Sequence, residues 1–216
     1  MSGNDGLSGS QGEFGHAVPV RPASGDGSAR VPGRCLRGHH LSVSGAGNGW
    51  SHFYDLPDVT CRVCAALGDP AATWCLIDPA RQFVSPSAPE RGLVLAVIPP
   101  VERGEPGRIE LRLNGQAVGE VRLAACGPCR RAVITGVGVE VALRRLGYGR
   151  VLVAAALARA PQARYRWSTA VLPDTVEACA FWSAIGFPGT VGKPHFCSDM
   201  RLLQGDSGPE TGIRRD

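Results

Sequence analysis

Arg144-Arg145-Leu146-Gly147-Tyr148-Gly149 lies between two apolar segments of different character. Residues 131–141 before it predict a β-strand, and residues 151–160 after it predict a helix. A glycine-bearing turn between a strand and a helix N-terminus favours phosphate binding. Glycine allows the chain to turn tightly, and the first N–H groups of a helix are free to bind an anion. Arginines in and beside this stretch add charged donors.

Length and composition bound the rest of the interpretation. The chain has 216 residues, a formal net charge of +4 and 44% hydrophobic residues, which suits one globular domain, or one domain plus a small module. We find no apolar run of membrane-spanning length and no basic-then-apolar signal at the N-terminus, so we expect a cytoplasmic protein. In that setting the eight cysteines are more typical of metal ligands or buried side chains than of disulfides.

Composition divides the chain into four segments. Residues 1–34 and 204–216 are rich in small and polar residues and are predicted to be a disordered arm and a disordered tail. Residues 35–80 are rich in cysteine and histidine but poor in aliphatic residues, which predicts a small module stabilised by a metal. Residues 90–203 are predicted to form the main domain.

The main domain has the pattern of an α+β fold. Four strands are expected first, followed by a helix, a fifth strand and a second helix that ends before Gly186. Asp174 is the expected N-cap of that second helix, with Glu177 completing a capping box. The predicted strands cover residues 92–98, 108–113, 117–124, 131–141 and 164–169, and the first helix covers 151–159.

Gly147 and Gly149 alone do not identify the ligand. A dinucleotide-binding loop needs a third spaced glycine and a P-loop needs Gly-Lys-Ser/Thr, and neither is present. The segment resembles the acetyl-CoA loop of the GCN5-related N-acetyltransferase (GNAT) family, Gln/Arg-x-x-Gly-x-Gly/Ala, here with Arg144 in first place. Residues 182–187 resemble the family's aromatic-x-x-x-Gly-Phe ending. The order of elements over residues 92–189 agrees with the same family.

The resemblance implies a GNAT-like, mostly antiparallel mixed sheet flanked by helices. It implies direct transfer of an acetyl group from acetyl-CoA to an amine of an unknown acceptor. The pyrophosphate would lie on backbone N–H groups from Leu146 to Arg150, the pantetheine arm beside residues 137–139, and an N–H near Val139 would polarise the thioester. The implied cofactor-binding residues are Val137, Gly138, Val139, Arg144, Arg145, Leu146, Gly147, Tyr148, Gly149 and Arg150.

The catalytic residues stay unassigned because the chain departs from the family's pattern. Trp182 stands where the family often has a tyrosine that acts as the general acid, and Val133 stands where some members have a glutamate that acts as the base. Thr175 replaces a frequent asparagine. Glu120 and Glu140 are nearby acids, but solvated surface positions are the simpler interpretation for both. A catalytically degenerate fold that binds acyl-CoA or a protein is therefore the main alternative to an active enzyme.

The family also places two helices between its first two strands, where they shape the acceptor cleft. Residues 99–107 are too few for such a pair. Either the cysteine-rich module replaces that wall, or the domain is reduced.

Cys35-x-x-x-His39 and Cys61-x-x-Cys64 are two ligand pairs with the spacing of a tetrahedral, zinc-ribbon-like site. His40 and His52 compete with His39 for the second position. Four protein ligands would close the site, so a structural zinc is expected. The module's basic and aromatic residues are interleaved with acids. This makes a zinc-dependent nucleic-acid adaptor a weaker alternative than protein binding or packing against the main domain.

Cys126-Gly-Pro-Cys129 has the spacing of a thioredoxin-type redox motif, but a strand follows it where that motif needs a helix. A hairpin turn is the simpler interpretation. Another possibility is that Cys126 and Cys129 join Cys61 and Cys64 in a four-cysteine zinc site. The remaining cysteines and two tryptophans are predicted to be buried, although either tryptophan could line an acyl pocket: Cys75, Cys179, Cys197, Trp167 and Trp182.

Overall fold

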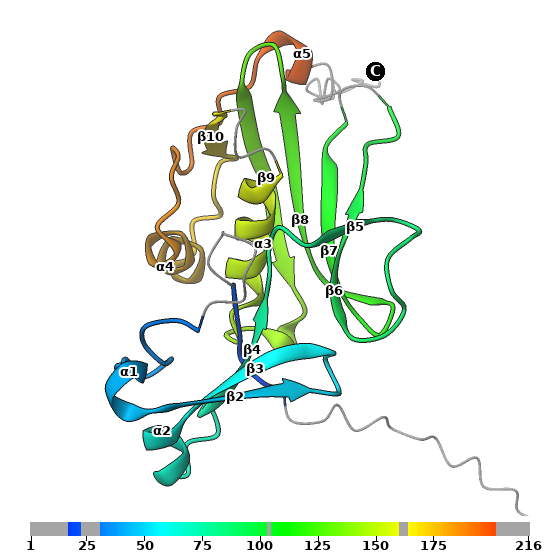
Figure 1. Ribbon diagram of the computed structural model, residues 1–216. Helices are drawn as coiled ribbons and strands as arrows, with labels where there is room; N and C mark the ends of the chain where they lie inside the picture. Colours follow the sequence, from blue (N-terminus) through cyan, green and yellow to red (C-terminus); the bar gives the residue numbers. More distant parts are fainter. Residues whose placement is uncertain (1–16, 23–30, 103–104, 160–163, 202–216) are drawn as a thin grey trace, which may run out of the picture.

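The computed structural model describes residues 17–22, 31–102, 105–159 and 164–201. These residues form two sheets and a few helices, which confirms the predicted α+β class (Figure 1). The smaller sheet has the strand order β1-β4-β3-β2, and the larger has the order β10-β9-β8-β7-β6-β5.

The smaller sheet belongs to the cysteine-rich module. Strands β2, β3 and β4 are antiparallel neighbours, and β1 pairs with β4 in parallel. The module's own apolar cluster is small, and it includes Cys35, Cys61 and Cys64 beside Trp74. A core of this size gives limited hydrophobic stabilisation, as expected for a module held by a metal. Its elements are β1 (Val20–Pro22), α1 (Leu41–Ser44), β2 (Ala46–Ser51), β3 (Leu56–Cys61), α2 (Arg62–Ala66) and β4 (Thr73–Ile77).

The larger sheet is an antiparallel meander from β6 to β9 with a parallel strand at each edge. Asn114 and Gly115 both have positive φ, 49° and 80°, and form the predicted hairpin turn. The elements are β5 (Gln82–Val84), β6 (Leu93–Ile98), β7 (Gly107–Leu113), β8 (Gln116–Cys126), β9 (Arg131–Val139), η1 (Val141–Leu143), α3 (Tyr148–Ala158), β10 (Arg166–Thr169), α4 (Val176–Ile185) and α5 (Ser198–Arg201).

Helix α3 lies against one face of the larger sheet and contacts β7, β8 and β9 (Figure 1). The face that it covers is apolar: Ile109 and Leu111 of β7 and Leu152 of α3 are 1% exposed or less. Helix α4 begins one residue later than predicted. Its N-cap is Thr175, whose hydroxyl accepts the N–H of Ala178, so the expectation of Asp174 as the cap is wrong. No helix separates β6 from β7 in the described part of that connection.

The predicted disordered arm over residues 1–34 is wrong for its described part. Val20 is 1% exposed and lies in the main apolar cluster with Tyr54, Cys75 and Tyr148. Two segments of the arm, 1–16 and 23–30, and the predicted tail over 204–216 lie outside the described residues. Because Tyr54 and Cys75 come from the module and Tyr148 from α3, the module and the main domain share one core.

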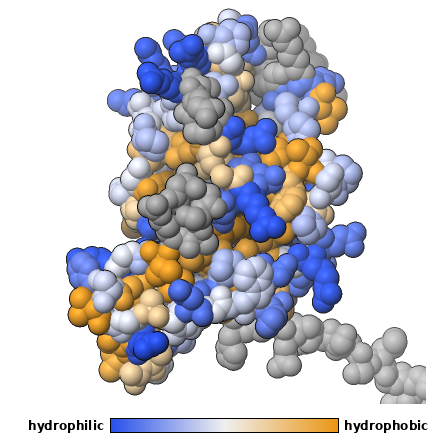
Figure 2. Space-filling model, in the orientation of Figure 1, coloured by the Kyte–Doolittle hydropathy of each residue, from blue (hydrophilic) through white to orange (hydrophobic). Residues whose placement is uncertain are grey.

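The surface of the module carries several apolar side chains. Val43 of α1 and Leu67, just after α2, are 87% and 76% exposed. Figure 2 shows apolar residues gathered at the lower left, where Figure 1 places these two helices. Within the described ranges, no helix is long and apolar enough to cross a membrane.

Candidate functional site

The β9 strand has one open edge over its second half. Strand β10 pairs with it in parallel only from Arg131 to Ile134. Beyond that point β9 still pairs with β8 on its other side, while no described strand pairs with residues 135–139 at the open edge. The β8–β9 register shifts between Arg122 and Leu123, which leaves Thr135 as the extra residue of a bulge. The open edge includes the predicted pantetheine-binding residues 137–139.

The chain then turns into α3 with several backbone N–H groups unused. Arg145 and Gly147 have positive φ, 64° and 94°, and Gly147 is the N-cap. The first N–H to bond back is that of Val151, to the Gly147 carbonyl at 3.1 Å. Those of residues 148–150 have no partner among the residues described. Unpaired N–H groups at a helix N-terminus attract an anion through both hydrogen bonding and the helix dipole.

The two glycines of the loop serve packing as well as turning. A Cβ on Gly147 would collide with the backbone carbonyl of Val20, so this glycine lets β1 lie directly against the loop. The Val20 N–H also donates to the Leu146 carbonyl. A Cβ on Gly149 would lie 2.9 Å from the Phe181 ring, so this glycine brings α4 close to α3. The sequence interpretation, in which the glycines admit the ligand, did not include these contacts.

Arginine side chains surround the start of α3. Arg144 donates from Nε to the Val139 carbonyl at 3.1 Å, and Arg150 donates from Nη2 to the Ala184 carbonyl at 3.0 Å. Burial and the charge of Arg150 lower the pKa of Arg21, whose guanidinium donates to the Arg34 carbonyl and lies over the Trp74 ring of the module. The sequence interpretation missed Arg21 because it lies in the supposed arm. The only signal was the short apolar run around Val18 and Val20.

The residues present fit a CoA group. An open strand edge leads into a loop whose unpaired N–H groups and exposed arginines suit a pyrophosphate. The ten predicted cofactor residues lie at the end of β9 and, after η1, in the loop and first turn of α3. Two cavities of the described chain lie away from this segment, one beside Trp167 and His195 and the other beside Pro99 and Arg159. The candidate cofactor site comprises the open edge of β9 and the exposed loop that follows it.

The positions that depart from the family pattern do not offer acid–base groups. Trp182 is 9% exposed and packs edge-on between Phe181 and Phe187, with centroids 5.2 Å from each. Val133 is fully buried. Both are therefore core residues.

Of the two acids named from the sequence, Glu120 lies on β8 and Glu140 lies just after β9. Glu120 is half-exposed and pairs with Arg122 at 3.2 Å, and Glu140 is exposed. A more buried carboxylate, Glu110, was missed. It pairs with Arg108 at 3.0 Å and Arg112 at 2.8 Å. Cα pairing puts Glu110 directly opposite Glu120 on the neighbouring strand.

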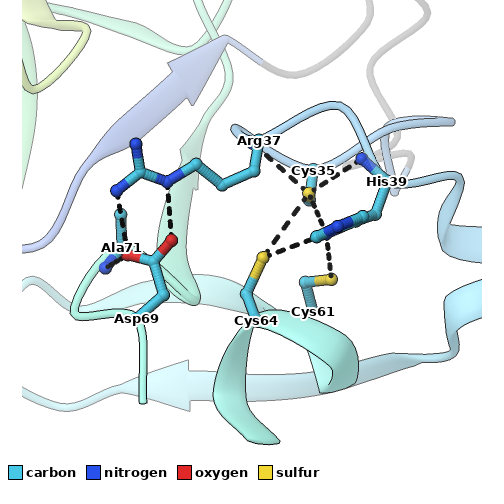
Figure 3. A network of polar contacts seen from close by, with 7 residues as sticks. All are labelled: Cys35, Arg37, His39, Cys61, Cys64, Asp69 and Ala71. Carbon is cyan, nitrogen blue, oxygen red and sulfur yellow. Dashed lines mark hydrogen bonds and ion pairs between the residues drawn. The ribbon is translucent and has the colours of Figure 1, made fainter. Parts of the chain in front are cut away.

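A second candidate site lies in the module. Figure 3 shows the side chains of Cys35, His39, Cys61 and Cys64 pointing toward one another. Their ligand atoms all lie within 4.8 Å of one another. Cys35 and His39 come from the turn before α1, whereas Cys61 and Cys64 come from the end of β3 and from α2. His40 is exposed and occupies the N-cap position of α1 without a side-chain cap hydrogen bond. Neither His40 nor His52 belongs to this group.

The spacing within this group suits a tetrahedral zinc ion. Bonds of about 2.3 Å to sulfur and about 2.0 Å to nitrogen put S and N about 3.5 Å apart, and two sulfurs about 3.8 Å apart. The Nδ1 atom of His39 lies 3.5 Å, 3.8 Å and 3.2 Å from the sulfurs of Cys35, Cys61 and Cys64. The Cys35 and Cys64 sulfurs are 3.8 Å apart. The site therefore has the dimensions that the ion requires.

The surroundings of the sulfurs favour ionisation of the Cys61 thiol and oppose ionisation of the Cys64 thiol. Burial of Cys61 opposes ionisation, but hydrogen bonds from the Cys64 N–H, Ser44 and neighbouring groups outweigh it and lower the pKa of Cys61 to about 6. Burial and the neighbouring sulfurs raise the pKa of Cys64 to about 12. A divalent cation would remove this conflict because it stabilises every thiolate bound to it.

The N–H groups of Arg37 and His39 donate to the Cys35 sulfur at 3.3 Å and 3.2 Å. Arg37 also pairs with Asp69 at 2.6 Å (Figure 3). These contacts hold the first ligand turn against the segment that follows α2.

The other cysteines are distributed differently from the predictions. Cys126 ends β8 and Cys129 lies in the turn to β9, and both group with Cys197 and Asp199. The four-cysteine site with Cys61 and Cys64 is therefore wrong. Cys75 is buried as predicted, whereas Cys179 is exposed, which corrects its predicted burial.

Comparison with protein families finds the acetyltransferase (GNAT) family model over residues 77–187, just over half of the chain. The match begins at the end of β4 and ends with Phe187, so it covers the candidate cofactor site and leaves the four ligands of the module outside. A search of curated proteins finds no match. The family match supports acyl-CoA-dependent N-acyl transfer as the general class of activity. The chain belongs to the GNAT acetyltransferase family.

Proposed function

We propose that this protein transfers an acetyl group from acetyl-CoA to an amine of an acceptor molecule. The observation that carries the proposal is the continuity of two features. The open edge of β9 leads directly to the N-terminus of α3, where the N–H groups of residues 148–150 have no described partner. A strand-like pantetheine arm suits an open strand edge, and a pyrophosphate suits a helix N-terminus.

Each part of this segment has an assigned role. Residues 137–139 bind the pantetheine arm through their backbone. The N–H groups from Leu146 to Arg150 bind the pyrophosphate, and Arg144 and Arg145 contribute charge beside it. Bound acetyl-CoA supplies the thioester, and a backbone N–H near Val139 polarises its carbonyl.

The acceptor amine loses its proton to solvent or to a surface carboxylate before it attacks. Trp182 takes no part in proton transfer, because an indole N–H is a donor only and does not ionise near neutral pH. The catalytic contribution of the protein is therefore mainly orientation and carbonyl polarisation.

We also propose that Cys35, His39, Cys61 and Cys64 bind a structural zinc ion. The donor set is typical of closed zinc sites, and the separations match a tetrahedron. These four protein ligands complete a tetrahedral coordination sphere and leave no position for a substrate. The zinc therefore has a structural role in the module.

Thermal unfolding with and without acetyl-CoA tests the cofactor site. At a hundred-fold excess over Kd, acetyl-CoA should add about 2.7 kcal/mol to the free energy of unfolding. The Arg145→Gln variant should show a smaller shift, while the control Arg91→Gln, also exposed but outside the loop, should match wild type. An unchanged melting temperature at millimolar acetyl-CoA would contradict the proposal. Release of free CoA thiol in the presence of an amine panel then tests transfer itself.

A second candidate function is protein binding by a fold that does not catalyse transfer. The exposed apolar side chains of Val43, Val63 and Leu67 favour it, because such residues gathered on one small module are typical of a docking surface. Acetyl-CoA binding without thiol release on any amine or protein acceptor is the result that would favour this function over an enzyme.

A further inference from the structure

Three cysteines and an aspartate meet at the end of the molecule opposite the module. Cys126 is the last residue of β8, Cys129 lies in the turn to β9, Cys197 directly precedes α5, and Asp199 is in the first turn of that helix. One ligand atom from each lies within 4.8 Å of every other. In Figure 1, α5 stands beside the β8–β9 turn at the top, whereas the module lies at the bottom.

The separations suit the same ion as in the module. Zinc bonds of about 2.3 Å to sulfur and about 2.0 Å to a carboxylate oxygen put these two atoms about 3.5 Å apart. The Cys126 thiol donates to Asp199 Oδ2 at 3.6 Å. The four donors converge from two segments about 70 residues apart in sequence, so neither local turn geometry nor a single motif accounts for their meeting.

The local backbone also has the form of a ligand turn. Cys126-Gly-Pro-Cys129 closes the hairpin, and Arg130 follows with a positive φ of 49°. The Arg130 N–H donates to the Gly127 carbonyl at 3.1 Å, which fixes the tight turn between the two sulfurs. Two cysteines on such a turn present both sulfurs to one point, as in zinc knuckles.

Apolar packing alone stabilises the contact between α5 and the β8–β9 hairpin only weakly. The cluster here is separate from the main core and consists of Ala124, Cys126, Val133, Cys197 and Met200, with Phe196 against it. Helix α5 has only four residues and contacts the sheet mainly at β8. A short helix of this kind gains little from its own hydrogen bonds, so a covalent or metal link would add most to its attachment.

The donor set decides the class of metal. Three thiolates select a soft or borderline ion such as zinc over magnesium or calcium, and a carboxylate completes the tetrahedron. Cys126 and Cys197 are buried, whereas Cys129 and Asp199 are exposed. The ion can therefore enter from the solvent side.

We propose that Cys126, Cys129, Cys197 and Asp199 form a second zinc site, which fastens the C-terminal segment around α5 to the β8–β9 hairpin. The site is structural, since four protein ligands fill its coordination sphere. It is independent of the zinc site in the module and of the cofactor loop. Zinc binding here displaces the thiol protons to solvent.

Metal analysis of the full-length protein, purified in the presence of a reductant, tests the proposal. Wild type should contain two zinc ions per chain. Cys197→Ser and Cys61→Ser should each retain one, and the double variant none. Cys179→Ser is the matched control, since this cysteine is exposed and outside both groups, and it should retain two. The zinc kept by Cys197→Ser also shows that this variant folds.

Two results would overturn the second site. One is a wild-type protein with a single zinc that Cys197→Ser keeps and Cys61→Ser loses. The other is a disulfide among Cys126, Cys129 and Cys197, detected by mass spectrometry in place of the second zinc. The carboxylate has its own test: Asp199→Ala should lose one zinc to a chelator at least ten-fold faster than wild type, and equal rates would exclude Asp199 as the fourth ligand.

Discussion

Glu110 is a carboxylate that the fold has nearly removed from solvent. Its side chain is 11% exposed and lies between Arg108 and Arg112, at 3.0 Å and 2.8 Å. Glu110→Gln should lower the free energy of unfolding by about 1–3 kcal/mol, because it leaves the partly buried Arg112 without its charged partner. Urea denaturation measures the loss.

Glu120→Gln is the matched control for that change. Glu120 lies opposite Glu110 on the next strand, but its pair with Arg122 is more exposed. The expected loss is less than about 1 kcal/mol, as for other surface ion pairs. Equal losses in the two variants would contradict the burial argument.

The start of α4 gives a second test at a single position. The Thr175 hydroxyl accepts the Ala178 N–H at 3.2 Å, so Thr175→Ala should lower the free energy of unfolding by about 1 kcal/mol. Asp174→Ala should cost less, since Asp174 is not the cap. If chemical denaturation gave the reverse order, Asp174 would be the cap in solution.

At the scale of elements, Gly147 in the loop and Gly138 in β9 should differ in how well they tolerate a side chain. Gly147→Ala should lower the free energy of unfolding by more than about 2 kcal/mol, because it forces a side chain into positive φ and against the Val20 carbonyl. Gly138→Ala should change it by less than about 1 kcal/mol, since a Cβ there meets nothing within 4 Å. Thermal melting of both variants checks this difference, and similar melting temperatures would contradict it.

That contrast limits how the loop can be tested. A large residue at Gly147 or Gly149 would disturb β1 or Phe181 as well as a ligand. Loss of acetyl-CoA binding in such a variant would therefore not identify the loop as the binding site. Arg145 is exposed, so its substitution reports on binding with less effect on the fold.

The sequence predicted the elements whose signals are local. Alternating residues and the Asn114–Gly115 turn define β7 and β8, and the ligand pairs of the module follow from their spacing. Strand β1 was missed because Val20 and its neighbours form a short run among small and polar residues, and its partner β4 lies more than 50 residues away. Asp199 was missed for the same reason, since a single carboxylate carries no ligand signal until the fold brings three sulfurs beside it.

At the scale of the whole molecule, the module and the acetyltransferase domain are mechanically linked. Val20 pairs with Cys75 of β4. Its backbone carbonyl also lies against Gly147, and its N–H donates to the Leu146 carbonyl. Tyr54 of the module lies in the same core as Tyr148, the first residue of α3. Order in the module is therefore expected to be needed for order in the cofactor loop.

Removal of zinc from the module should consequently weaken acetyl-CoA binding, although no ligand of that zinc lies in the loop. Zinc contributes about 10–16 kcal/mol to the folding of small zinc modules, so Cys61→Ser should loosen β3 and β4 and release β1 from Gly147. We expect a lower melting temperature and at least a ten-fold higher Kd for acetyl-CoA by calorimetry, with Cys179→Ser equal to wild type. A Cys61→Ser protein that has lost one zinc and still binds acetyl-CoA with wild-type affinity would show that the loop holds its shape without the module. In that case the contact between Val20 and Gly147 would be a consequence of the fold rather than a support for the site.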